Sequence, residues 1–124
     1  MEDNPFLQSY EPEKEFPTEE RCHILELLNN HSDKPFSIAR ARVEPQVTTA
    51  WHYLRDTIEH YYILKGKGLM EIGNKETFAV FPGDVVTIPA YEPQRITNVD
   101  FKEDLLFLAI CSPAFTDGNY EACE

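Results

Sequence analysis

The chain has 124 residues, enough for one domain that buries roughly two-thirds of the surface of its unfolded form. Apolar residues make up 42% of the sequence, which predicts a packed core. The net charge of −11 argues against nucleic acid and anionic membranes as partners, because both bind clustered Lys and Arg. No apolar run reaches the ~18 residues of a membrane span, and no signal peptide pattern is present, so we expect a cytoplasmic protein.

The first segment, residues 1–20, contains three prolines, no periodicity, and seven acids against one lysine. We expect an acidic N-terminal arm that is either disordered or packed on a neighbour through its apolar side chains. These are Phe6, Leu7, Tyr10 and Phe16. The β-barrel domain is expected over residues 21–112, followed by a C-terminal tail over 113–124 that has no clear pattern.

The middle of the chain is a succession of short segments rich in β-branched and aromatic residues and separated by turn residues. Nine strands are predicted, over residues 22–28, 36–43, 48–54, 58–65, 68–72, 76–81, 84–89, 94–99 and 104–111. Their even spacing and the absence of a helical period indicate an all-β protein, an antiparallel β-sandwich or small barrel. The cysteines have no C-x-x-C spacing, and we interpret Cys22 and Cys111 as buried, unreactive thiols.

Successive side chains of a strand point to opposite faces, so the sequence predicts which residues share a face. His52 shares a face with Leu54, and Glu59 shares one with Tyr61 and Ile63. In the strand over 94–99 the corresponding set is Gln94, Ile96 and Asn98. If these strands are neighbours in a barrel, polar groups converge in one lumen: His52, Glu59, Tyr61 and Gln94.

Two motifs within residues 51–98 resemble those of the cupin superfamily. The first is a histidine pattern followed by a glutamate and a glycine, here His52-Tyr53-Leu54, Glu59 and Gly66. The second is Pro82-Gly83-Asp84, Pro89, Gln94 and Asn98. The resemblance implies a jelly-roll-like double-stranded β-helix, and the chain is most similar to small single-domain (type 2) cupins of bacteria. Such cupins commonly form dimers, so we expect a homodimer.

The resemblance also implies a divalent metal bound by three histidines and the glutamate. Only His52 and Glu59 match, since Leu54 has no donor atom and Gln94 offers only an amide oxygen. His52, Glu59 and Gln94 would form a weak or vestigial site for Fe, Mn, Ni or Zn. The alternative is no metal, with His52 hydrogen-bonded and Glu59 either paired with an arginine or raised in pKa and acting as a proton carrier.

A pocket inside the barrel is expected to be lined by Leu54, Tyr61, Ile63, Ile96, Asn98 and Arg40. Arg40 and Arg42 share a face and could hold a carboxylate or phosphate, or they could form salt bridges with the acidic surface. Trp51, Tyr53, Tyr62 and Leu64 are predicted to face away from the site, where they would pack between sheets or form a dimer interface.

Three functions remain open at this stage. One is a pocket that binds a small polar molecule without turnover. Another is a metal-dependent isomerase, lyase or dioxygenase acting on a sugar or organic acid, with Glu59 and Tyr61 as catalytic residues. The third is an interaction role for the arm and the aromatic face.

Overall fold

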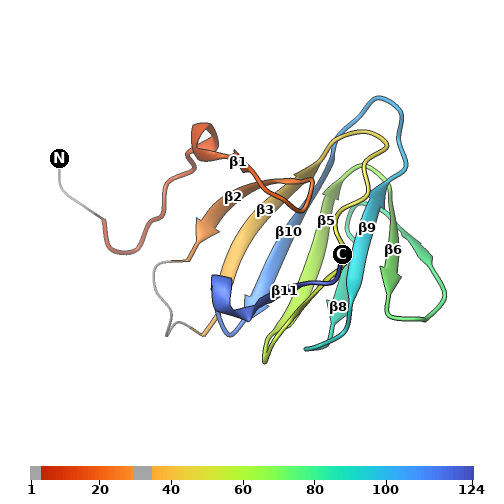
Figure 1. The fold of residues 1–124 in the computed structure, drawn as a ribbon. Helices are drawn as coiled ribbons and strands as arrows, with labels where there is room; N and C mark the ends of the chain where they lie inside the picture. The colour runs from red at the N-terminus through yellow and green to blue at the C-terminus, as the bar shows by residue number, and fades with distance from the viewer. Residues whose placement is uncertain (1–3, 30–34) are drawn as a thin grey trace.

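The computed structural model describes residues 4–29 and 35–124 as two antiparallel sheets packed face to face (Figure 1). The first sheet has the order β1-β2-β3-β10-β5-β8 and the second β11-β4-β9-β6-β7, which confirms the predicted all-β antiparallel sandwich. The strands of the first sheet are β1 (Phe16–Pro17), β2 (His23–Leu28), β3 (Ser37–Val43), β10 (Leu105–Ser112), β5 (Ile58–Lys65) and β8 (Val85–Ile88). Those of the second are β11 (Tyr120–Ala122), β4 (His52–Leu54), β9 (Gln94–Asn98), β6 (Gly68–Ile72) and β7 (Phe78–Val80). Two single-turn 3₁₀ helices, η1 (Pro12–Lys14) and η2 (Asp117–Asn119), lie near the chain ends.

Buried and exposed side chains alternate along β5 as the sequence predicts. Glu59, Tyr61 and Ile63 are buried between the sheets, whereas the side chains at positions 58, 62 and 64 are exposed. The facing strand β9 buries Gln94, Ile96 and Asn98 in the same way. Because β5 and β9 belong to different sheets, their inward side chains meet across the interior.

One end of this interior is filled by large apolar side chains. Val43 of β3 lies opposite Leu105 of β10, and both are fully buried. Ile63, Met70 and Ile96 complete the packing and are also fully buried. Burial of such side chains is worth roughly 1.5–3 kcal/mol each, so this end supplies much of the stability of the domain.

The opposite end of the same strands carries small side chains. In the register of β3 and β10, Ala39 lies opposite Ala109 and Ser37 lies opposite Cys111. These residues face inward but cannot reach the second sheet as Val43 and Leu105 do. The interior is therefore dense at one end and open at the other.

Two glycines allow tight turns between strands. Gly66 has φ +94°, and a Cβ there would lie 2.9 Å from the carbonyl oxygen of Asp104, so only glycine fits without a shift of the backbone. Gly83 also has φ +94°, which the turn after Pro82 requires.

The structure differs from the predicted elements in the region of Thr48 and at the chain ends. Strand β4 begins only at His52, and Thr48 makes an isolated bridge to Thr97. Strands β1 and β11 were not predicted; they pair with β2 and β4 and bring both terminal segments onto the barrel. Among the described residues, no helix is long and apolar enough to cross a membrane.

Candidate functional site

A chain of hydrogen bonds crosses the interior from one sheet to the other. The Tyr61 hydroxyl donates to Gln94 Oε1 at 2.8 Å, and Gln94 Nε2 donates to Glu59 Oε1 at 2.5 Å. All three side chains are at least nine-tenths buried. The predicted convergence of the residues on β5 and β9 is therefore present as a linear array in which Gln94 connects a phenol to a carboxylate.

This orientation of Gln94 bears on the metal that the cupin resemblance implies. The amide oxygen of Gln94, its only good ligand atom, accepts a hydrogen bond from the Tyr61 hydroxyl, and the amide nitrogen donates to Glu59. A cation at Glu59 would meet an N–H donor rather than an oxygen. Leu54, at the position of a second histidine, supplies no ligand. Within residues 4–29 and 35–124 no group of three His, Cys, Asp or Glu side chains has the geometry to hold a metal ion. The donor set does not fit a cupin metal.

His52 lies beside this array, in β4, and its own contacts fix the ring. Nδ1 is 2.9 Å from the carbonyl oxygen of Ala50 and 3.2 Å from Glu20 Oε2. Since both oxygens accept, Nδ1 carries a proton, and these two contacts fix the orientation of the ring. The imidazole also stacks on Tyr120, with ring centroids 5.0 Å apart. The ring is thus hydrogen-bonded through Nδ1 and stacked on Tyr120, contacts that a histidine makes with or without a metal ion.

The burial of Glu59 changes its protonation. Desolvation raises the pKa of this carboxyl from 4.5 to about 7, His52 opposes the rise, and the nearby Glu20 adds to it. Burial also raises the pKa of Glu20. Glu59 can therefore exchange a proton near neutral pH, and two carboxyl groups share the neighbourhood of one imidazole.

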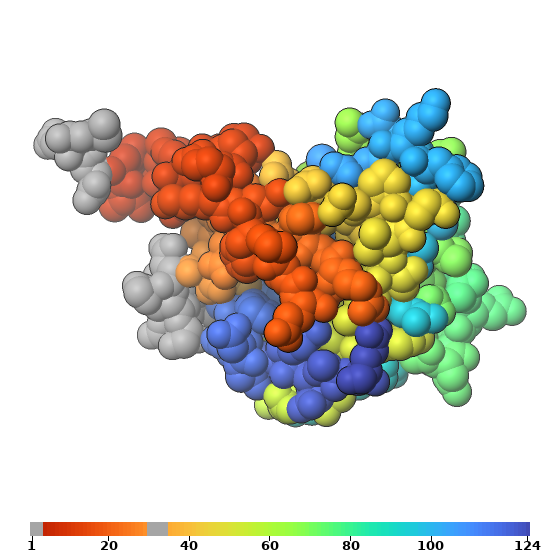
Figure 2. Space-filling model, turned by 45° about the horizontal axis from the view of Figure 1, so that its top comes forward, coloured from red at the N-terminus to blue at the C-terminus, as the bar shows by residue number. Residues whose placement is uncertain are grey.

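A cavity of about 550 Å³ occupies the open end of the barrel, and Glu59 and Cys111 are among its walls. It lies between the inner faces of β2, β3 and β10 and the two terminal segments, which run side by side at the surface (Figure 2). Arg21 and Glu124 join these segments by a bidentate ion pair at 3.0 and 3.1 Å. The described residues that line it are Phe16, Thr18, Glu19, Glu20, Ile24, Glu26, Asn29, Ser37, Ile38, Ala39, Ala50, Glu59, Ala109, Cys111, Phe115, Asp117, Tyr120, Ala122 and Glu124.

Most residues predicted to line the pocket lie elsewhere in the interior. Leu54, Ile63 and Ile96 are buried side chains that do not reach this cavity. Tyr61 also lies away from its walls, with its ring 4.3 Å from that of Phe107. Asn98 holds the chain around residue 100, because its amide donates to the carbonyls of residues 43 and 103, both at 2.9 Å.

Arg40 requires a correction, because it points out of the barrel. It lies on β3 between the inward-facing Ala39 and Ala41, and it donates to Glu15 at 3.1 Å and to the Tyr10 hydroxyl at 2.7 Å. Arg42 binds the same Glu15 carboxylate at 2.7 Å. Both arginines thus fasten the N-terminal arm to the outer face of the sheet, as the salt-bridge alternative for these residues anticipated.

Three residues around Glu59 and His52 were not predicted as site residues. Glu20 comes from the arm, Tyr120 comes from the tail, and Cys111 lies 3.6 Å from Glu59 Oε2. Glu20 stood in an acidic run without periodicity, and β11 has only three residues, so neither carried a pattern signal. The alternation of Cys111 with Ala109 on β10 was the one available sign of a thinly filled interior.

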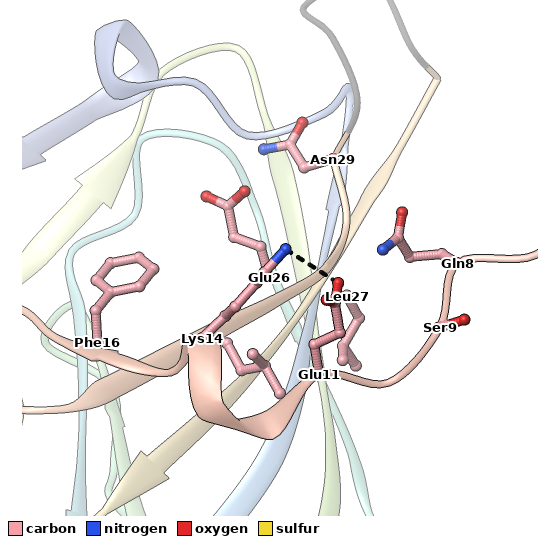
Figure 3. A pocket seen from close by; sticks show the side chains of 9 residues that line it. Gln8, Ser9, Glu11, Lys14, Phe16, Glu26, Leu27 and Asn29 are labelled. Carbon is pink, nitrogen blue, oxygen red and sulfur yellow. Dashed lines mark hydrogen bonds and ion pairs between the residues drawn. The ribbon is translucent and has the colours of Figure 1, made fainter. Parts of the chain in front are cut away.

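A second hollow, of about 390 Å³, lies between the arm and β2 (Figure 3). Gln8, Ser9, Glu11 and Lys14 line its arm side, and Lys14 donates to Glu11 at 3.1 Å. None of its described lining residues is a buried titratable group comparable with Glu59. The cavity at Glu59 is the better candidate for a functional site.

Comparison with known proteins matches the Cupin domain family over residues 39–111. An uncharacterized protein of Methanocaldococcus jannaschii is 37% identical over 117 residues, which cover 93% of this chain and 92% of the relative. A vicilin-like seed storage protein of Arabidopsis thaliana is 32% identical over 80% of this chain, but the chain spans only 20% of that relative.

Solved structures share the fold at low sequence identity. Streptomyces PAC13, in a variant with uridine, has a TM-score of 0.75 at 15% identity and covers 94% of this chain and 89% of its own. PAC13 is described as a nucleoside dehydratase. KdgF from a Halomonas species has a TM-score of 0.71 at 14% identity, covering 85% of this chain and 89% of its own. The match of the family model over residues 39–111, more than half of the chain, shows that this chain belongs to the cupin family.

Proposed function

We propose that this cupin binds a small polar molecule in the cavity at the open end of the barrel, against Glu59. The observation that carries the proposal is the carboxyl group of Glu59, a residue that is only 7% exposed and lies at the wall of a cavity of about 550 Å³. Burying such a group is costly, and the hydrogen bond from Gln94 holds it facing the cavity. The structural neighbour PAC13, a nucleoside dehydratase whose variant structure contains uridine, supports a small-molecule ligand.

We further infer that binding needs no metal ion, although cupins often bind metals. The weakly bound Fe, Mn, Ni or Zn expected at His52, Glu59 and Gln94 is the competing hypothesis. Elemental analysis of untagged protein, purified without chelator and then soaked in each metal, should find well below one equivalent. A stoichiometric metal that chelators remove together with ligand binding would overturn the metal-free site.

Acid–base catalysis on the bound molecule is a second candidate. It is favoured by one observation, the pKa of Glu59 near 7, which suits a group that must both accept and donate a proton at neutral pH. Tyr61 reaches Gln94 rather than the cavity, so its role in such a reaction is to position Gln94. Incubation of each binding compound with the protein, followed by product analysis, tests this; Glu59→Gln should abolish any turnover.

The binding proposal is tested by a thermal-shift screen of nucleosides, sugars and organic acids, with hits confirmed by calorimetry. At least one compound should raise the melting temperature of the wild type and lose affinity in Glu59→Gln, which keeps the hydrogen bond acceptor but not the charge. Glu76→Gln makes the same charge change on the β6–β7 turn, where the side chain is exposed, and should bind normally. Equal affinity in the wild type and Glu59→Gln would place the ligand elsewhere.

A homodimer and a cytoplasmic location remain predictions from the sequence. The outer face of the first sheet exposes apolar side chains on β5 and β8, which supports an interface there: Ile58, Tyr62, Leu64 and Val85. Tyr53 belongs to the second sheet, so the predicted aromatic set does not form a single surface. Light scattering after gel filtration would determine the oligomeric state.

A further inference from the structure

The charge of the cavity walls is one-sided. Six lining residues are acidic, namely Glu19, Glu20, Glu26, Glu59, Asp117 and Glu124, and no Lys or Arg is among the described lining residues. Arg40 and Arg42, the basic residues of β3, face outward and are bound by Glu15. An anionic ligand would therefore enter a negative field without any cation to receive it.

The acidic groups differ in exposure and in pairing. Glu19, Glu26 and Asp117 are exposed and form no ion pair within residues 4–29 and 35–124. Glu124 is paired with Arg21, and the Glu20 carboxyl has His52 Nδ1 as a hydrogen-bond partner at 3.2 Å. Uncompensated charge is thus left at the exposed positions and at the buried Glu59.

Glu59 itself has unused capacity as an acceptor. Its Oε1 accepts a hydrogen bond from the Gln94 amide. Among the described residues, Oε2 has only the Cys111 thiol as a donor, at 3.6 Å, and a thiol is a weak donor at a long distance. The side chain is buried and lies at the cavity wall. A ligand that donates strong, charge-assisted hydrogen bonds would satisfy this oxygen.

Apart from the polar side chains of Thr18, Asn29, Ser37 and Cys111, the remaining walls are apolar and aromatic. Phe16, Phe115 and Tyr120 contribute rings, and Ala50 and Ala109 contribute methyl groups. Aromatic faces attract cations and also bury hydrocarbon, so they suit a charged head on an apolar body. The same negative surroundings act on the neighbours of the site: after burial, the nearby Glu20 carboxyl is the next cause raising the pKa of Tyr120 and of Cys22.

We infer that the cavity selects a small organic cation, an amine attached to an apolar or aromatic group, whose ammonium lies against Glu59 Oε2. The inference rests on the proposed function, since it names the ligand class of the same site. It disfavours the organic acids that the sequence left open as substrates. It also assigns the exposed Glu26 and Asp117 a role in attracting the ligand.

The test uses two sets of compounds with the same apolar group and head groups of different charge: phenethylamine, phenethyl alcohol and phenylacetate, and then cyclohexylamine, cyclohexanol and cyclohexanecarboxylate. Affinities are measured by calorimetry or by amide chemical shifts at pH 7 in low and high salt. In at least one set, the affinity of the amine should be about tenfold or more above that of its neutral analogue, which is the difference that one charge-assisted contact supplies. The affinity of the amine should also fall as the salt concentration rises. The anion should not bind.

Variants separate charge attraction from pocket shape. Glu26→Gln combined with Asp117→Asn should lower the affinity for the amine several-fold and leave the affinity for a neutral analogue unchanged. The matched pair Glu76→Gln with Asp100→Asn should change neither affinity. Equal or tighter binding of the neutral or anionic members would overturn the cation inference while leaving the binding site in place. If neither amine binds but compounds of the broader screen do, the inference also fails. If nothing binds in either experiment, the proposed function fails with it.

Discussion

The packed end and the open end of the barrel interior are built on the same strands from opposite kinds of side chain. At the packed end, Val43 of β3 lies opposite Leu105 of β10. At the open end, six residues away along β3, Ser37 lies opposite Cys111. The hydrogen-bonded ladder is continuous over both ends, so the backbone does not make the difference. Side-chain volume alone decides where this cupin is a core and where it is a cavity.

The two ends also treat polar groups differently. Asn98, at the packed end, is fully buried and its amide donates to two carbonyls, while its side-chain oxygen accepts from residue 100. Glu59, at the open end, is buried beside empty volume with one oxygen poorly satisfied. The first arrangement stabilises the fold, and the second has a cost in stability that a ligand can offset.

The largest expected effect is at the packed end. Ile63→Ala removes a fully buried side chain from dense surroundings and should lower the free energy of unfolding by about 3–4 kcal/mol. Urea denaturation followed by fluorescence measures it. Ile58→Ala, on the same strand but outward and 45% exposed, is the control and should cost less than about 1 kcal/mol. Similar costs at both positions would contradict the inward assignment of Ile63.

The cost of burying Glu59 should appear as a pH dependence. Its folded-state pKa is raised from 4.5 to about 7, so the folded state binds more protons between these values and loses stability as the pH rises through them. Relative to Glu59→Gln, the wild type should lose roughly 3 kcal/mol as the pH rises from below 4.5 to about 8, and little more at higher pH.

The measurement is urea denaturation of both proteins at several pH values. The difference between them isolates Glu59 because Gln has no charge and the other titrating groups are common to both. For the control Glu76→Gln, at an exposed position, the free energy of unfolding should change with pH in the same way as that of the wild type. A difference between wild type and Glu59→Gln that is flat from pH 5 to 8 would show that this carboxyl is not desolvated.

Two alanines on one strand sharpen the comparison of the ends. Ala41 is 2% exposed and packed, whereas Ala39, two residues earlier on the same face, lines the cavity. Ala41→Leu should destabilise the protein by about 2 kcal/mol through overpacking, and Ala39→Leu should change stability by less than about 1 kcal/mol. Thermal and urea denaturation of the pair provide the test. Equal destabilisation would mean that the open end is filled by something other than solvent or ligand.

The smallest effect concerns the arm that closes the cavity. Glu15 bridges Arg40 and Arg42 with its side chain 15% exposed, and these arginines lower its pKa. Glu15→Gln should cost about 1 kcal/mol, the upper range for such partly exposed ion pairs, and should speed proteolysis within residues 4–15. Glu13→Gln, an exposed neighbour in η1, is the control. Unchanged proteolysis would show that other contacts hold the arm.

The sequence was sufficient for the fold and for the inward parity of the central strands. Period-two alternation and the turn glycines are strong signals in β5 and β9, so the meeting of Glu59 with Gln94 could be predicted. Strands of two or three residues have no periodicity, and for this reason β1 and β11 were not predicted. The terminal segments reach the barrel through pairings that no local pattern encodes.

The cavity could not be located from parity alone. Ile63 and Glu59 share a face, yet one lies in dense packing and the other beside a cavity, because the residues facing them on β10 differ in volume. That comparison requires the register of β5 with β10, in which Ile63 is opposite Phe107 and Glu59 is opposite Cys111. Arg40 illustrates the same limit, since its alternation allowed either face until its neighbours were placed.

The most direct test of the open end as the ligand site is calorimetric titration of the best-binding compound into Ala109→Phe. The new ring would occupy the cavity beside Glu59 without touching the packed end. The fold of Ala109→Phe should be unchanged, and its affinity for the compound should fall at least a hundredfold, because the ring removes the contact surface of a small ligand. The control Ala79→Phe, on the exposed edge strand β7, should bind as the wild type does. If Ala109→Phe binds the compound as tightly as the wild type does, the open end of the barrel is not the ligand site.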